Sequence, residues 1–448
     1  MVFNGESRMI LEVTRAALPL SFDDPDYDAL IDAIGDSRIV LIGEASHGTH
    51  DFYRERARIT QRLIAEKGFC AVAAEADWPD AYRVNRYVLG LPPTAETAED
   101  NSAIAALGGF QRFPAWMWRN MDLVAFIVWL REHNRSGHNC AGFYGLDLYS
   151  LYTSAQAVLA YLDKTDPAAA KRARFRYSCF DAFEEDTQAY GYAANFGMTE
   201  SCEAAVIAQL TELQRKAGEV ASWDGPAARR EAFSAELNAL LVRDAERYYR
   251  TMFDRGESSW NLRDTHMADT LDRLLEFLGP QAKVVVWAHN SHLGDARATQ
   301  MGKRGELNLG QLVRERYGAQ SFNIGFTTHN GEVTAANDWD EPAERMIVRP
   351  GLDGSYEKLF HDTGLGNFLL PLRDDPRLRE ALAAPMLERA IGVIYRPDTE
   401  RQSHYFRASL SQQFDAVIHI DRTRALTPLE TATPPHHEEA PETYPNAL

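Results

Sequence analysis

The sequence has little cysteine and no metal-binding or disulfide spacing. Four cysteines occur in 448 residues, and no two of them form a CxxC pair. This scarcity argues against a disulfide framework or a zinc ribbon and favours a reducing cytoplasm. The four are Cys70, Cys140, Cys179 and Cys202.

Long apolar runs are also absent. The longest extends only from Leu123 to Leu130, whereas a membrane-spanning helix needs about 20 apolar residues. The N-terminal segment has no apolar stretch after a basic start, so we expect no signal peptide. We therefore expect no membrane partner.

Positive charge is scarce relative to negative charge. Lys and Arg number 47 against 65 Asp and Glu, a formal net charge of −18. Nucleic-acid binding relies on clustered cations, so we expect no nucleic-acid partner. An acidic protein repels anionic substrates and accepts neutral or cationic ones. No P-loop and no convincing GxGxxG follows a predicted strand, so nucleotide binding has no support.

The residues that are present predict an α/β protein. Short β-branched or small apolar runs indicate buried strands, and helical patterns alternate with them. The alternation predicts a three-layer α/β/α core with a mixed, largely parallel sheet. The strands are expected near residues 38–43, 70–74, 140–146, 283–288, 322–326, 345–349, 391–396 and 416–421.

Helices are expected between these strands. Gly68 is the expected C-terminal cap of the first, Asp77 the possible N-cap of the second, and Asn330-Gly331 signals a hairpin. The expected helices cover Tyr53–Lys67, Pro79–Leu89 and Trp116–His133.

A segment with helical spacing and no strand signal interrupts the α/β pattern. We interpret residues 167–278 as a helical insertion that divides the α/β core into residues 36–166 and 279–430. Residues 431–448 are rich in Pro and Glu and are expected to be disordered.

Ionisable residues follow four of the predicted strands. They are Glu44, Glu75, Asp147 and His289. Ligands of open α/β sheets bind outside the carboxyl ends of the strands. One such residue is usually only a helix cap, but four of them favour a functional cluster on one rim.

The residues after the first strand include a candidate base. His47 lies in a glycine-flanked loop, three residues beyond Glu44, and an imidazole suits a general base at neutral pH. His50 is better explained as the start of the following helix. Ser46 lies in a sequence similar to a nucleophile elbow, but Glu44 replaces the first glycine of that motif. Ser46 is therefore not expected to be a nucleophile.

A second pair of imidazoles follows the fourth strand, in His289-Asn-Ser-His292. The spacing differs from the H-E-x-x-H pattern of helical zinc sites. On a continuing strand the two side chains would point to opposite faces. Both can reach one site only if the strand ends at about His289 and the backbone then turns.

At these residues the sequence resembles the erythromycin esterase family, whose members include enzymes that hydrolyse the lactone ester of macrolide antibiotics. The resemblance extends from about residue 36 to residue 429 and implies a three-layer α/β core with a largely helical addition. It rests on the blocks IVLIGEASHGTHDFYRERARITQRLI, AVAAEADWPDAYRVNRYV, WMWRN, FYGLDLYS, WAHNSHLGDAR and SHYFRASLSQQFDAVIHIDRTRALTPL.

The resemblance implies a set of site residues. His47 matches the general base, and the other positions are Glu44, Arg56, Glu75, His289 and His292. We expect hydrolysis by His47-activated water, without a covalent intermediate and without a cofactor. Glu75 or Glu44 would orient His47, and Arg56 or one histidine of the second pair would stabilise the oxyanion.

Two other functions remain open. The same histidines and glutamates, with Asp147, could bind zinc or another divalent ion in a metal-dependent hydrolase or transferase. A protein that binds a small ligand or haem without catalysis is the third reading. For a small-molecule ester, the helical insertion could form one wall of the cleft. The candidate substrate-binding residues are Trp78, Tyr82, Trp116, Trp118, Asp147 and Tyr149.

Overall fold

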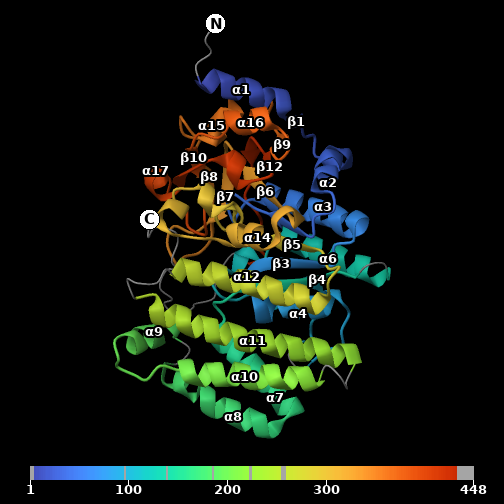
Figure 1. Ribbon diagram of the computed structural model, residues 1–448, viewed down its shortest axis with the longest axis vertical. Helices are drawn as coiled ribbons and strands as arrows, with labels where there is room; N and C mark the ends of the chain where they lie inside the picture. Colours follow the sequence, from blue (N-terminus) through green and yellow to red (C-terminus); the bar gives the residue numbers. More distant parts are fainter. Residues whose placement is uncertain are drawn as a thin grey trace.

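The computed structural model describes residues 5–94, 97–137, 140–183, 186–220, 225–253 and 259–430. Its centre is an eight-stranded sheet in the order β1-β9-β12-β6-β2-β5-β3-β4 (Figure 1). The strands from β12 to β4 run parallel, whereas β9 and β1 are antiparallel to their neighbours. The predicted mixed, largely parallel sheet is confirmed. Its strands are β1 (Leu18–Pro19), β2 (Ile39–Ile42), β3 (Ala71–Asp77), β4 (Gly142–Asp147), β5 (Val284–Trp287), β6 (Ser321–Thr327), β9 (Phe368–Pro371) and β12 (Ala416–His419).

Helices cover both faces of the sheet. Ile39 and Leu41 of β2 pack in one apolar core, whereas Val40 and Ile42 pack in another, as the two-residue period of a strand dictates. Strands that are buried on both faces need apolar residues at successive positions, which explains the uninterrupted runs. The predicted three-layer α/β/α architecture is therefore confirmed.

Local signals set the ends of the helices beside the sheet. Helix α3 begins at His50, and Gly68 ends it in the left-handed conformation with φ 72°. The helix expected from Trp116 begins only at Met121. Asn120 caps it by accepting a hydrogen bond from the Leu123 N–H at 2.8 Å.

The helical part of the chain forms a stack on one side of the sheet, with α12 nearest to the strands (Figure 1). Among the described residues between 167 and 278 there is no strand. Helix α7 precedes residue 167 but packs on α11, so the stack begins earlier in the chain than the sequence indicated. The helices are α7 (Leu151–Thr165), α8 (Pro167–Tyr177), α9 (Thr187–Asn195), α10 (Glu203–Val220), α11 (Gly225–Thr251) and α12 (Ser259–Leu278).

This helical stack contains a disulfide bond that the sequence analysis did not expect. Cys179 and Cys202 are bonded, with their Cα atoms 5.9 Å apart. The expectation that these cysteines stay unpaired is wrong. Their separation of 23 residues carries no recognisable spacing signal, and packing of the helices brings them together.

Two small sheets lie outside the central one, and they correct two predictions. The Asn330-Gly331 pair does not turn a hairpin, because β6 and the following β7 belong to different sheets. A Cβ at Gly331 would lie 2.1 Å from the carbonyl oxygen of Thr423, so close backbone approach explains this glycine. The segment from Ile391 makes only isolated bridges and is not a strand. The small sheets contain β7 (Asn330–Ala335), β8 (Glu344–Val348) and β13 (Arg422–Thr423), and β10 (Met386–Arg389) and β11 (Tyr405–Ala408).

In the described part of the chain, no helix has the length and apolar character that crossing a membrane requires. The tail predicted to be disordered, residues 431–448, lies outside the described residues. The other helices are α1 (Gly5–Ala16), α2 (Asp28–Ile34), α3 (His50–Lys67), α4 (Trp78–Val88), α5 (Ala103–Ala106), α6 (Met121–Arg135), α13 (Asn290–Leu293), α14 (Leu309–Tyr317), α15 (Tyr356–His361), α16 (Pro376–Ala381), α17 (Glu400–Ser403) and α18 (Leu410–Gln413).

Candidate active site

The carboxyl ends of four adjacent strands, β2, β5, β3 and β4, carry the ionisable residues of the candidate site. Glu44 and His289 follow β2 and β5 directly, while Glu75 and Asp147 lie at the ends of β3 and β4. All four side chains are buried. The fold thus gathers on one rim the residues that follow the strands in the sequence.

His47 and Glu44 form a buried pair in the loop after β2. The Nδ1 atom of His47 lies 3.0 Å from Oε1 of Glu44, and Glu44 is fully buried. A Cβ at Gly48 would meet the carbonyl oxygen of Thr334 at 1.7 Å, so only glycine lets this loop pass the neighbouring strand. Of the two carboxylates considered as partners of His47, the structure places Glu44 beside the ring.

Arg56 lies behind this pair. Its Nη1 atom is 3.4 Å from Oε1 of Glu44, and the guanidinium is fully buried between the rings of Tyr53 and Trp287, at 4.5 and 4.7 Å from their centroids. Arg58 of the same helix pairs with the buried Glu55. Arg56 therefore faces Glu44 from within the protein.

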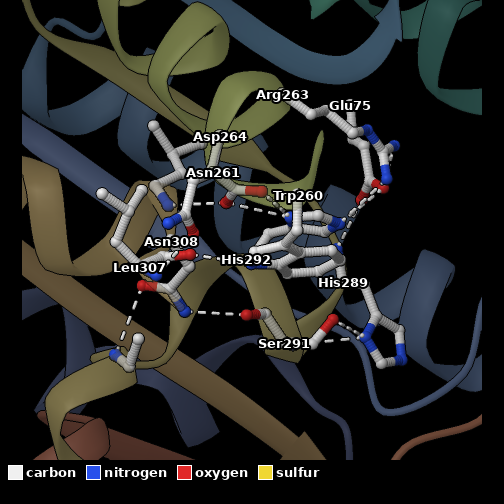
Figure 2. Close-up of polar contacts among 12 residues, drawn as sticks. Glu75, Trp260, Asn261, Arg263, Asp264, His289, Ser291, His292, Leu307 and Asn308 are labelled. Atoms are coloured by element: carbon white, nitrogen blue, oxygen red, sulfur yellow. Dashed lines mark hydrogen bonds and ion pairs between the residues drawn. The ribbon is translucent and has the colours of Figure 1, made fainter. Parts of the chain in front are cut away.

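His289 is held as a neutral ring. Its Nδ1 accepts a hydrogen bond from the Ser291 N–H at 3.2 Å (Figure 2), so Nε2 carries the proton. Burial and the neighbouring His47, whose ring centroid is 4.9 Å away, hold the pKa of His289 well below its usual value. Within the described residues, Nε2 has no hydrogen-bond partner. The pocket lining does not include His289, whose ring lies beside that of His47.

His292 has the opposite environment. Its Nδ1 lies 2.9 Å from Asp264 of α12, and its Nε2 lies 3.2 Å from Glu75 (Figure 2). Burial lowers the pKa of His292, but the two carboxylates outweigh burial and raise it to about 9. Trp260 stacks on the ring with centroids 4.3 Å apart. The turn after β5 lets both histidines reach one site, as the spacing required.

Arg263 of α12 joins the two remaining rim carboxylates. Its Nε and Nη2 atoms donate to Asp147 at 2.9 and 2.6 Å, and Nη2 also donates to Glu75 at 2.8 Å. Despite the cost of burial, His292 and Arg263 hold the pKa of Glu75 well below its usual value. The guanidinium takes the oxygen atoms that a divalent ion would use, and the described residues include no His, Cys, Asp and Glu cluster with metal-binding geometry.

The pocket opens beside these groups. Trp118 and Asp147 line it, as the sequence analysis expected. Trp78 and Tyr82 instead pack beneath α11, where Trp78 donates a hydrogen bond to Ser234 at 3.2 Å. The residues lining the pocket are His47, Glu75, Ala76, Asp77, Asp80, Phe110, Arg112, Phe113, Pro114, Ala115, Met117, Trp118, Asp147, Arg263, Ser291, His292, Trp339 and Val393.

Two further aromatic candidates also lie outside the pocket lining. Trp116 is buried in the core on the α3 side of the sheet. Tyr149 lies under the guanidinium groups of Arg112 and Arg263, at 4.6 and 4.9 Å from its ring centroid. The apolar wall consists instead of Phe110, Phe113, Met117, Trp339 and Val393, together with Trp118.

Asp77 and Asp80 form an acidic edge of the pocket. Asp77 occupies the predicted N-cap position of α4, but its side chain makes no capping hydrogen bond. It accepts from Arg112 at 3.1 Å and from the Ser150 N–H at 3.2 Å. Burial raises the pKa of Asp80 to about 8, and the negative charge of Asp77 adds to this shift.

Sequence reasoning missed the contribution of α12. Trp260, Arg263 and Asp264 all reach the rim from this helix, which had been assigned only helical spacing. One signal was present: Asp264 stands in the buried stripe with Trp260, Met267, Leu271 and Leu274, at the three- and four-residue spacing of one helix face. A carboxylate in such a stripe requires a buried partner.

The comparisons with known proteins show the family of the chain. The model of the family described as erythromycin esterase matches residues 64–423. The chain belongs to the erythromycin esterase family. It is 21% identical to erythromycin esterase type II of Escherichia coli over 429 residues, which covers 91% of this chain and 96% of that protein. Erythromycin esterase type I of Escherichia coli is 22% identical over 437 residues, covering 92% and 97%.

A solved structure of this family shares the fold. It is a mutant of the erythromycin esterase EreC in its open conformation, with a TM-score of 0.59 and 17% identity. The alignment covers 90% of this chain and 95% of that one. The mixed sheet with its helical stack is therefore the erythromycin esterase fold.

Proposed function

We propose that this member of the family hydrolyses a carboxylic ester or macrolactone with water activated by His47. The observation that carries the proposal is the buried His47–Glu44 pair at the pocket, with the two atoms 3.0 Å apart. Glu44 accepts a hydrogen bond from the Nδ1–H of His47, which leaves Nε2 of the ring free to take a proton from water. His47 is then the general base of the reaction.

In the proposed reaction, His47 takes one proton from water as its oxygen attacks the ester carbonyl carbon. The negative charge moves to the carbonyl oxygen, where the positive ring of His292, which lines the pocket, stabilises it. The C–O bond to the alcohol then breaks. His47 returns the proton to the leaving oxygen, so the products are a carboxylic acid and an alcohol.

Ser46 has no place in this mechanism. It is buried, its hydroxyl is hydrogen-bonded to the Thr49 hydroxyl, and it is absent from the pocket lining. The apolar wall of aromatic residues favours a bulky neutral body for the substrate. The net charge of −18 favours a neutral or cationic ester over an anionic one.

The test compares the parent protein with His47→Ala on macrolides of different ring size and on simple esters, with mass detection of the added water. General bases contribute about 10²- to 10⁴-fold to rate, so His47→Ala should lose activity by that factor while folding normally. His50→Ala is the matched control, because His50 pairs with Asp122 outside the pocket lining. Hydrolysis by His47→Ala at the parent rate would overturn the proposal.

A further inference from the structure

Four ionisable groups from three elements surround the ring of His292. Asp264 and Arg263 face it from α12, Glu75 from β3, and His289 from the end of β5 (Figure 2). The two carboxylates lie at 2.9 and 3.2 Å, and Nη1 of Arg263 lies 3.3 Å from Nε2. Arg263 opposes a positive ring, but its own charge is already held by the bidentate contact with Asp147.

Asp264 is itself fixed in place. It is fully buried, and its Oδ1 accepts a hydrogen bond from the Leu309 N–H at 2.7 Å, at the start of α14. Both of its oxygens face Nδ1 of His292, at 2.9 and 3.0 Å. In the described part of the chain, His292 is the only cation paired with Asp264. Burial raises the pKa of Asp264 and His292 opposes that shift, so the negative charge of this carboxylate depends on the ring it faces.

Trp260 packs against one face of the same ring. The two rings are nearly parallel, at 14°, and the Nε1–H of Trp260 donates to the Leu307 carbonyl at 2.7 Å (Figure 2). A ring clamped between an indole and a carboxylate cannot rotate to exchange its two nitrogen atoms. Nδ1 consequently stays directed at Asp264, and Nε2 stays directed at Glu75 and the pocket.

We propose that Asp264 is a positioning residue that keeps His292 doubly protonated and fixed as a positive charge beside the pocket. The charge keeps Glu75 ionised, and Glu75 in turn accepts the His289 N–H at 2.8 Å and holds the turn after β5. The use of this charge on the oxyanion rests on the proposed function. The protonation of the ring does not depend on it.

This role connects the helical stack to the chemistry. Asp264, Trp260 and Arg263 all lie on the first turns of α12, next to the rim. A displacement of this helix would remove the counter-charge of His292 and the clamp on its ring together. The helical stack is then part of the catalytic apparatus as well as a wall.

The first experiment measures protonation directly. NMR titration of histidine-labelled protein, with His292 assigned from the spectrum of His292→Gln, should give a midpoint near 9 in the parent. Asp264→Asn should lower that midpoint by about 1 to 3 pH units, the effect of removing one adjacent carboxylate. Asp269→Asn is the matched control, because Asp269 lies on the same helix and pairs with Arg316 at the surface. It should leave the midpoint unchanged.

The second experiment measures the consequence for hydrolysis. Asp264→Asn should lower kcat by about 10- to 100-fold at pH 9, because a midpoint that is about 1 to 3 pH units lower leaves few His292 rings protonated there. The loss should be smaller near pH 6.5, where the ring regains its proton, and KM should change little. Asp264→Glu, which retains the charge, should restore part of kcat. If Asp264→Asn lost only packing, the loss of kcat would be the same at both pH values, and Asp264→Glu would restore none of it.

The outcomes separate the two proposals. A midpoint near 6.5 in the parent, or a midpoint unchanged by Asp264→Asn, overturns the role of Asp264 whatever the substrate. A lowered midpoint with an unchanged pH dependence of kcat overturns its effect on catalysis. If the parent hydrolyses no ester while its midpoint lies near 9, the proposed function fails and the protonation of His292 stands. If Asp264→Asn does not fold, the parent midpoint and Asp264→Glu decide.

Discussion

Two histidine–carboxylate pairs meet at the rim, and they are built in different ways. Glu44 and His47 come from one loop after β2. Asp264 and His292 are 28 residues apart in the sequence, and their contact joins the helical stack to the turn after β5. The carboxylate of the first pair also faces Arg56, while that of the second contacts His292 and a backbone N–H. In the proposed mechanism, one pair moves a proton and the other keeps one.

Replacing the carboxylate of each pair tests this difference and has the largest expected effect. Glu44→Gln leaves His47 without its anionic partner, and the analogous change in a hydrolytic triad lowers kcat by about 10⁴. We expect a loss of that order, larger than that of Asp264→Asn. The measurement is kcat for both variants across the pH range, with urea unfolding to confirm that each folds. Equal losses would show that the two pairs do the same work.

The second comparison concerns stability. Arg263→Met leaves Glu75 and Asp147 buried without their shared guanidinium, and breaking a buried ion pair in this way costs about 3–5 kcal/mol. Arg273→Met removes a half-exposed arginine of the same helix, which pairs with Glu276 at the surface, and should cost at most about 1 kcal/mol. Urea unfolding measures both. Similar losses would mean that Arg263 does not hold α12 to the rim.

The same contrast explains what the sequence could predict. The strand-end residues and His47 are local features, because a parallel sheet brings successive strand ends to one rim whatever its loops do. The placement of Glu44 beside His47 follows from three residues of chain. The pair of histidines after β5 was visible in the sequence as well, whereas Arg56 was added only by the resemblance to a known family.

The partners of those histidines could not be predicted in the same way. Asp264 reaches His292 only because α12 packs across the ends of the strands, a contact that depends on the whole helical stack. The aromatic residues near the motifs were equally uncertain. Trp78 and Trp118 are both buried tryptophans, yet only Trp118 lines the pocket. The apolar character of a tryptophan predicts that it is buried, whereas the direction in which its side chain points depends on the packing around it.

The pH dependence of stability tests the fixed charge of His292. A histidine whose pKa is raised from 6.5 to about 9 binds its proton more tightly in the folded state. Its contribution to stability is complete below pH 6.5 and is lost as the pH rises through 9. The difference in unfolding free energy between the parent and His292→Gln should therefore shrink over this range. A difference that is independent of pH would contradict the charged ring.

The smallest effect concerns the clamp on the ring. Trp260→Phe keeps an aromatic face under His292 but loses the hydrogen bond to the Leu307 carbonyl, a loss of about 1 kcal/mol in unfolding free energy. The NMR midpoint of His292 should stay near 9, because Asp264 and Glu75 are untouched. Trp260→Leu removes the aromatic face as well and should lower kcat without shifting the midpoint. If Trp260→Leu moves the midpoint as far as Asp264→Asn does, ring stacking and not the carboxylate governs the proton, and the contrast between the two histidine pairs fails at that point.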